Sequence, residues 1–177
     1  MIVLYIIFAV IVVLVLAWGV PAVLSTFFGA PWSPTPKESV HAMHKMAKVG
    51  KNDLVYDLGS GFGRISMIAA KDYDARSVGI EIDPIKHIIS ESWAKISMLT
   101  DRVQFIRGNF FDVDLSDADV VTCYLLHPTN KKLMDKFESE LKIGTRIVSH
   151  SFTFPGWKMI DKDETKNLFL YVTGESY

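Results

Sequence analysis

Asp57-Leu58-Gly59-Ser60-Gly61-Phe62-Gly63-Arg64 is the stretch that decides the fold of this 177-residue chain. The apolar run 54–56 precedes it and residues 65–70, also mostly apolar, follow it. This order predicts a strand, a glycine turn and the start of a helix. The glycines lack the Cβ atoms that would keep a ligand away from the backbone. The helix that follows presents free N–H groups and the positive end of its dipole, so the stretch predicts a cradle for a cofactor.

The rest of the chain alternates strand and helix patterns, which predicts an α/β fold with a mostly parallel sheet and helices on both faces. In such sheets ligands bind beyond the carboxyl ends of the strands. A first helix is predicted from Pro36 to Val49, with Thr35 as its N-cap and Glu38 completing a capping box. Further strands are predicted at 54–58, 77–82, 103–107, 118–126 and 146–154, helices at 64–71, 84–99 and 130–141, and a closing hairpin at 157–160 and 167–173.

The helix predicted at 84–99 carries six large apolar side chains on or near one face. They are Ile85, Ile88, Ile89, Trp93, Ile96 and Leu99.

Composition excludes several classes of site. The net charge of −1 gives no electrostatic reason to expect a nucleic-acid partner. The single cysteine, Cys123, excludes an internal disulfide and a cysteine-rich zinc site, and its apolar surroundings favour a buried structural thiol. His41 and His44 share a helical face without an acidic or cysteine partner at ligand spacing. We therefore predict no metal site.

The first 36 residues contain no Lys, Arg, Asp or Glu, and residues 2–24 are almost continuously apolar. About 20 apolar residues cross a bilayer, so residues 1–28 are predicted to be a transmembrane anchor that contacts membrane lipid. A cleaved signal peptide and a buried soluble helix are the alternatives. The former is opposed by the lack of a basic N-terminal region.

Lysines 37, 45, 48 and 51 all follow the apolar segment, which predicts a single-pass membrane protein with its catalytic domain in the cytoplasm. Residues 29–36 are proline-rich and are predicted to form a stiff linker. Residues 37–177 are then the globular domain.

The glycine spacing distinguishes between cofactors. A dinucleotide-binding G-x-G-x-x-G motif that starts at Gly59 requires glycine at position 64, which is Arg64. The pattern Asp57-x-Gly59-x-Gly61-x-Gly63 instead resembles the first motif of class I S-adenosylmethionine (SAM)-dependent methyltransferases, which have a Rossmann-like fold. Glu81, at the end of the next strand, is suited to accept hydrogen bonds from both ribose hydroxyls.

The third strand ends in Gly108-Asn109-Phe110. Methyltransferases commonly hold the adenine amino group with an acid at the position of Asn109. Asn109 can accept that hydrogen bond through its amide oxygen, and Phe110 can pack on the ring. The alternative is that Asn109 only shapes the turn.

The flanking segments resemble one group more closely. It comprises the membrane-anchored protein lysine methyltransferases of the ATP synthase c-subunit and the adenine nucleotide translocase, with their archaeal relatives of broad lysine specificity. The resemblance covers residues 31–157 and rests on 33–36, 56–65, 79–81 and 149–157. Phe62 and Asn109 depart from the group, since both positions commonly hold an acid there.

This resemblance implies SAM as the cofactor and a protein with an accessible lysine as the substrate. It places Thr35 over the methionine end of the cofactor. Asp57 either holds the loop amides or lies near the cofactor's amino group. The predicted cofactor-binding residues are Thr35, Asp57, Gly59, Ser60, Gly61, Gly63, Glu81, Ile82, Asn109 and Phe110.

Methyl transfer to lysine needs a neutral amine at attack distance, and the end of the fourth strand is the natural place for it. Tyr124 is predicted to line the transfer channel and His127 to accept the proton or orient the amine. Alternatively, Tyr124 packs over the cofactor and His127 caps the turn at Pro128. His150 is also expected on the ligand side, as a ligand contact or as a structural histidine.

Two other functions stay open. One is methylation of a small molecule or lipid beside the membrane, and the other is a non-catalytic SAM-binding module. A nucleic-acid methyltransferase is disfavoured, because residues 126–129 replace the Asn/Asp-Pro-Pro-aromatic tetrad.

Overall fold

The computed structural model describes residues 1–27 and 34–177. The chain divides into two compact units, Met1–Ser33 and Pro34–Tyr177. Residues 29–33 of the predicted linker lie outside the described residues.

The N-terminal unit contains helix α1 (Ile2–Phe27), whose described side chains are exposed. They are those of residues 2–13 and 15. Within residues 1–27 and 34–177, no helix combines the length and the apolar character that a membrane span requires. The prediction of a transmembrane anchor at 1–28, and of a membrane protein with a cytoplasmic domain, is therefore wrong.

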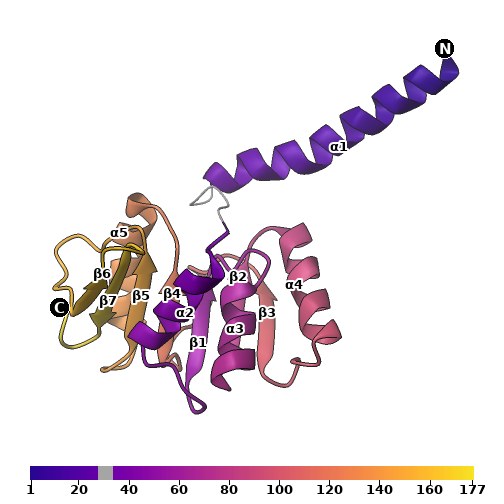
Figure 1. The fold of residues 1–177 in the computed structure, drawn as a ribbon. Coiled ribbons are helices and arrows are strands. Elements are labelled where there is room, and N and C mark those ends of the chain that lie inside the picture. Colours follow the sequence, from indigo (N-terminus) through magenta and orange to yellow (C-terminus); the bar gives the residue numbers. More distant parts are fainter. Residues whose placement is uncertain (28–33) are drawn as a thin grey trace. The chain divides into compact units, whose positions relative to one another are not determined.

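The Pro34–Tyr177 unit is built on a mixed sheet of seven strands in the order β3-β2-β1-β4-β5-β7-β6 (Figure 1). The first five in this order are parallel, and β7 and β6 are antiparallel to their neighbours. The fold class predicted for this unit, a Rossmann-like α/β methyltransferase sheet, is confirmed. The strands are β1 (Leu54–Leu58), β2 (Arg76–Glu81), β3 (Val103–Arg107), β4 (Val120–Cys123), β5 (Arg146–His150), β6 (Asp161–Asp163) and β7 (Leu168–Val172).

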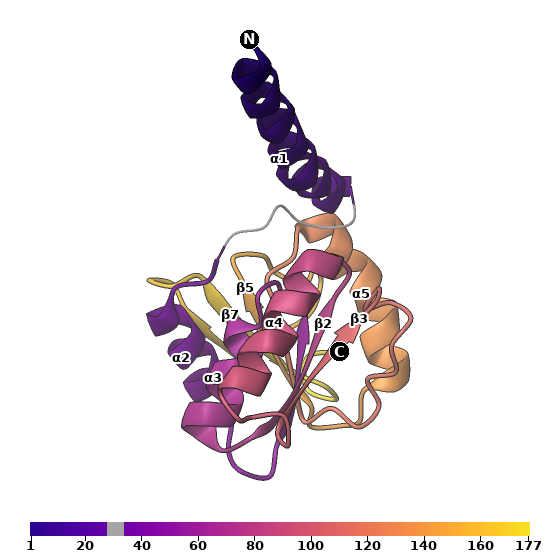
Figure 2. The ribbon, with the colours of Figure 1, turned by 90° about the vertical axis from the view of Figure 1, so that its right-hand side faces the viewer.

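The connections put helices on both faces of this sheet (Figure 2). The chain runs outward from β1 to β3 and then returns to β4 and β5. Because parallel crossovers are right-handed, this reversal places α3 and α4 on one face and α5 on the other. Helix α2 packs beside α3. The helices are α2 (Lys37–Met46), α3 (Arg64–Tyr73), α4 (Pro84–Ile96) and α5 (His127–Glu140).

Several predicted boundaries shift. Helix α2 begins at Lys37 with Pro36 as its N-cap, and no side chain caps it, so the predicted capping box is wrong. Strand β4 ends at Cys123, and α5 already begins at His127, three residues before the predicted start. The closing hairpin forms, but its first strand is β6 and not 157–160.

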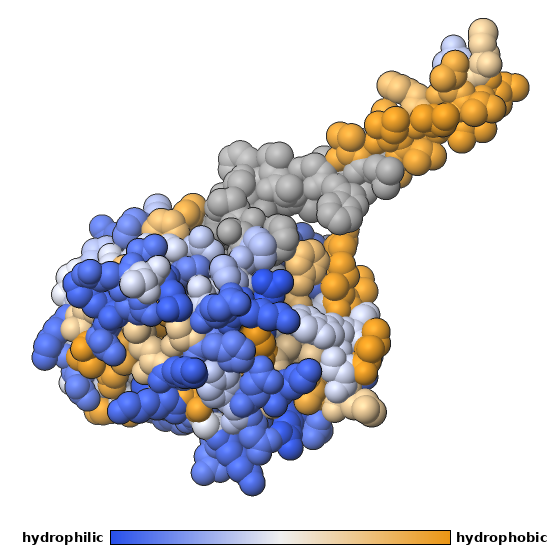
Figure 3. Space-filling model, viewed as in Figure 1, coloured by the Kyte–Doolittle hydropathy of each residue, from blue (hydrophilic) through white to orange (hydrophobic). Residues whose placement is uncertain are grey.

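Helix α4 does not bury its isoleucines. Only Ser90 and Ala94 of this helix are buried, whereas Ile88 and Ile96 are 60% and 81% exposed. Figure 3 shows hydrophobic residues at the side of the domain where Figure 1 places α4. The small residues face inward because they let α4 approach the sheet and the glycine turn closely.

Candidate active site

The glycine turn joins β1 to α3 at the carboxyl edge of the sheet. Gly59, Gly61 and Gly63 all have positive φ angles, of 76°, 57° and 82°. The N–H groups of Gly59 and Ser60 both donate to the Ile80 carbonyl, at 3.0 and 2.9 Å. These bonds tie the turn to the neighbouring strand β2. Left-handed backbone favours glycine, so the glycine turn between β1 and α3 forms where the spacing predicts it.

The turn rests on the ring of Phe105 from β3. A Cβ atom at Gly63 would lie 2.4 Å from Phe105 Cζ, and one at Gly79 would lie 2.6 Å from the same ring. Gly63 and Gly79 are therefore required for packing beneath the turn. The sequence does not predict that Gly79 and Phe105 pack beneath the turn, because nothing local links them to the glycine motif.

Glu81 fixes the turn from the end of β2. Its Oε2 accepts the Gly61 N–H at 2.7 Å, and its Oε1 accepts the Asp83 N–H at 2.9 Å. The side chain is buried. Each carboxylate oxygen has a second acceptor direction, so Glu81 can hold the turn and still accept from a ligand hydroxyl.

Asp57, the last residue but one of β1, carries a buried carboxyl group. Its Oδ1 accepts the Thr122 hydroxyl at 3.0 Å, while its Oδ2 has no hydrogen-bond partner. Burial, followed by the nearby Glu81 charge, raises the pKa of Asp57 to about 7. A buried carboxylate is costly unless paired, so this group is suited to a cationic partner.

Buried polar atoms without partners gather at this edge of the sheet. Besides Asp57 Oδ2, they include Ser60 Oγ, Asn130 Oδ1 and His150 Nδ1. Buried polar groups are nearly always hydrogen-bonded in folded proteins. Asp57 Oδ2 and Ser60 Oγ lie in or next to the glycine turn, so a polar ligand with an amino group fits these two free atoms.

Thr35 is buried and is tied to the start of α3. The Arg64 guanidinium donates to the Thr35 carbonyl at 2.8 Å. The sequence does not identify the partner of Arg64, and the structure shows that it is the Thr35 carbonyl. This hydrogen bond also holds the segment before α2 next to the glycine turn.

Three predicted cofactor-binding residues lie just beyond β2 and β3, two of them, Asn109 and Phe110, predicted to contact adenine. Ile82 is 40% exposed and Phe110 is buried against Phe111, with ring centroids 4.8 Å apart. Asn109 is exposed, and its Oδ1 accepts the Phe111 N–H at 3.1 Å. Asn109 therefore shapes the turn, and only its second acceptor direction remains for a ligand.

Four rings lie together at the ends of β4 and β5. The rings of Tyr124 and His150 have centroids 4.2 Å apart, and those of His127 and Phe152 5.1 Å apart. Tyr124 also lies near Phe152, at 6.3 Å. The structure thus brings both predicted catalytic residues to one group of rings, and it adds Phe152, which sequence reasoning did not select.

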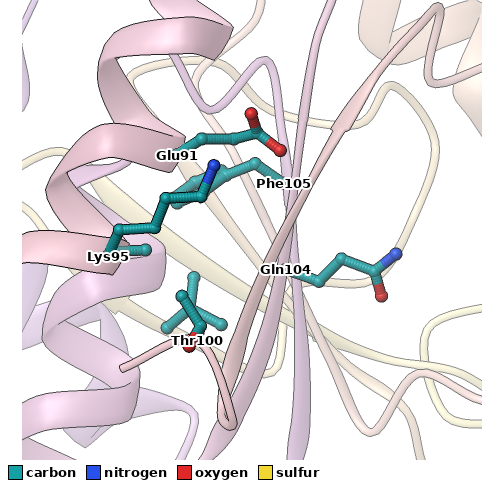
Figure 4. A pocket seen from close by; sticks show the side chains of 7 residues that line it. Glu91, Lys95, Thr100, Gln104 and Phe105 are labelled. Carbon is teal, nitrogen blue, oxygen red and sulfur yellow. The ribbon is translucent and has the colours of Figure 1, made fainter. Parts of the chain in front are cut away.

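A separate depression of about 330 Å³ lies between α4 and β3 (Figure 4). It is lined by Glu91, Lys95, Thr100 and Gln104 over an apolar floor that includes Phe105. Thr100 precedes β3, so the depression opens toward the amino end of that strand and not toward the glycine turn. In the part of the chain that the structure describes, no cluster of His, Cys, Asp or Glu could hold a metal ion.

Comparison with known proteins agrees with this geometry. Residues 57–161, more than half the chain, match the ANTKMT methyltransferase domain. A protein-lysine N-methyltransferase from Saccharolobus islandicus is 45% identical over 82% of this chain and 94% of its own length. The mouse adenine nucleotide translocase lysine N-methyltransferase is 30% identical over 63% of this chain, and the match spans about half of that protein (48%).

A solved structure shares both fold and sequence. The crystal structure of an RNA methyltransferase from Salinibacter ruber, in complex with S-adenosyl-L-homocysteine, is 40% identical with a TM-score of 0.77. The match covers 82% of this chain and 96% of that one. The glycine turn, the strand order and these matches together show that the chain belongs to the family of the ANTKMT methyltransferase domain.

Proposed function

We propose that this chain is a SAM-dependent protein-lysine N-methyltransferase, with residues 37–177 as its methyltransferase domain. The observation that carries the proposal is the pairing of the Glu81-braced glycine turn with the unpartnered Asp57 carboxyl group. The protein-lysine N-methyltransferase at 45% identity supports lysine as the acceptor.

The predicted cofactor residues divide into three roles. Near Thr35, Asp57 provides a free acceptor for the cofactor's ammonium group, and the Ser60 hydroxyl can donate to its carboxylate. Glu81 provides acceptors for the ribose hydroxyls. The adenine side is formed by Ile82, Asn109 and Phe110, and the three glycines of the turn let the ligand approach the backbone.

When bound, SAM supplies an electrophilic methyl group on a sulfonium. A new N–C bond to the lysine nitrogen forms as the C–S bond breaks, and the amine proton leaves to solvent or to a neighbouring base. The chain's task is to strip water from the amine and orient it, because lysine has a reference pKa of about 10.4. Tyr124 is proposed to line the transfer channel, and the exposed His127 to accept or relay the proton.

RNA is the competing acceptor, because the Salinibacter ruber relative is an RNA methyltransferase. Against it, the net charge of −1 offers little to neutralise a phosphate backbone. The segment after β4 also lacks an Asn/Asp-Pro-Pro-aromatic tetrad. Protein therefore remains the preferred acceptor.

The decisive experiment supplies purified full-length protein with methyl-labelled SAM and, separately, with total cell protein and total RNA. We expect label in the protein arm, recovered as methyl-lysine after acid hydrolysis. Label confined to RNA, or to other methylated amino acids, would contradict the proposal. Mass spectrometry of the labelled proteins then identifies the lysine sites.

Two variants test the cofactor site by calorimetry. Glu81→Ala removes the acceptor of the Gly61 N–H, and Gly61→Arg fills the turn, so both should abolish SAM binding. Glu164→Ala is the matched control for Glu81→Ala, because Glu164 is exposed on the turn between β6 and β7. If SAM affinity is unchanged in both site variants, the assignment of the cofactor site fails.

A further inference from the structure

The ring group at the ends of β4 and β5 forms a continuous aromatic surface. Phe152 lies between Tyr124 and His127, at centroid distances of 6.3 and 5.1 Å. Tyr124 and Phe152 are only partly buried, so both rings keep an open face. Their position beyond the strand ends is the ligand side of the sheet.

This surface adjoins the glycine turn. Leu125, which directly follows Tyr124, lies so close to Gly59 that a Cβ atom there would be 3.3 Å from Leu125 Cδ2. The side chain that follows Tyr124 in the chain therefore contacts the proposed cofactor cradle, and the ring group lies beside it. A substrate that approaches the cradle from this side must pass the rings.

The loop that carries Phe152 is held by buried polar groups. Asn130 Nδ2 donates to the Phe152 carbonyl at 3.1 Å and to Ser149 Oγ at 3.3 Å. Ser149 Oγ in turn donates to the Phe152 carbonyl. Asn130 is completely buried at the start of α5, so the loop is fixed from two elements.

The ring behind Tyr124 carries no charge. Burial lowers the pKa of His150, which backs the Tyr124 ring, so this imidazole is neutral at neutral pH. Aromatic faces attract ammonium groups and pack against methylene chains. The faces of Tyr124 and Phe152 therefore suit a lysine side chain, with its apolar stem and cationic end.

We propose that Phe152 and Tyr124 form the wall along which the methylene stem of the target lysine lies, and that Phe152 sets the enzyme's selectivity for that side-chain length. Asn130 is the positioning residue that holds Phe152 in this wall. This inference rests on the proposed lysine methyltransferase function and assigns the residues that select its substrate.

The test compares two peptides built around a lysine site that the wild-type enzyme has methylated. One carries lysine and the other ornithine, whose side chain is shorter by one methylene. A hydrophobic pocket discriminates one methylene by about 10- to 200-fold. We expect the wild-type enzyme to favour lysine in kcat/KM by at least about 10-fold, within that range.

Phe152→Ala should reduce this lysine-to-ornithine ratio to within about threefold, since the contact that distinguishes the side chains is removed. Asn130→Ala should lower the same ratio, while SAM affinity measured by calorimetry stays at the wild-type value. Phe152→Leu, which keeps more of the volume, serves if the alanine variant does not fold. Phe169→Ala is the matched control, because Phe169 is a half-buried phenylalanine on β7 outside the ring group.

The outcomes separate the two proposals. A wild-type enzyme that methylates no lysine in cell protein refutes the proposed function itself. A wild-type enzyme that methylates both peptides equally, or a Phe152→Ala variant that loses activity with an unchanged ratio, overturns the wall and leaves the function intact. If the lysine-to-ornithine ratio falls equally in Phe169→Ala, the effect is one of general packing, and the proposed wall is overturned as well.

Discussion

Gly63→Ala tests the central packing claim, that the glycine turn rests directly on Phe105. Gly63 has φ of +82°, and a left-handed backbone costs a residue with a Cβ about 1–2 kcal/mol. The new Cβ would also lie 2.4 Å from Phe105 Cζ and 3.0 Å from Ser90 Cβ. Overpacking of this kind costs about 1–3 kcal/mol more, so the free energy of unfolding should fall by about 2–5 kcal/mol.

Gly144→Ala provides the matched control. Gly144 has a similar φ of +89°, but a Cβ atom there would meet nothing within 4 Å. This variant should pay only the backbone cost of about 1–2 kcal/mol. The difference between the two variants in urea unfolding isolates the steric contribution of Phe105.

A double-mutant cycle makes the test sharper. Phe105→Leu removes the Cε1 and Cζ atoms that the new methyl group would strike. In that background Gly63→Ala should cost little more than Gly144→Ala, because the clash is gone. Equal costs for Gly63→Ala and Gly144→Ala in the wild-type background, or no coupling in the cycle, would refute the packing described here.

Three further predictions concern buried or tethering groups. Burial raises the pKa of Asp57 to about 7, so this group should lower the stability of the ligand-free domain as pH rises from about 4 to 7, by up to about 1.4 kcal/mol per pH unit; Asp57→Asn should remove this contribution in chemical denaturation, and parallel curves would contradict it. Burial lowers the pKa of His44 to about 4, so the stabilisation from its neutral form is present above pH 6.5 and is lost as pH falls toward 4; His44→Leu should remove this contribution, which opposes that of Asp57 over the same range, and a curve parallel to the wild type would contradict it. Arg64→Ala removes the hydrogen bond to the Thr35 carbonyl, so it should lower the free energy of unfolding by about 1–3 kcal/mol and speed hydrogen exchange at the start of α2. Unchanged exchange there would show that Arg64 does not hold this segment.

The prediction of a membrane anchor rests on composition and on the number of apolar residues in 2–24 alone. Within the residues that the structure describes, no helix meets the length and apolarity that a membrane span needs.

The apolar face of α4 shows a different limit of prediction from sequence. Periodicity correctly grouped the isoleucines on one side of the helix, but it could not reveal which side faces the sheet. The inward side is set by Ser90 and Ala94, because Phe105 and the glycine turn leave room only for small side chains.

The sequence by itself determined the alternation of strands and helices, the position of the glycine turn and the resemblance to lysine methyltransferases, which the family match confirms. These features depend on neighbours along the chain, such as glycine spacing and apolar periodicity, so local rules suffice. Only the tertiary structure decided that Glu81 braces Gly61, that Asp57 is buried with one free oxygen, and that Phe152 joins Tyr124. The two contacts join residues that are 20 or more positions apart in the chain, and the state of Asp57 depends on burial. Contact and burial alike arise when strands pack together, which no short stretch of sequence records.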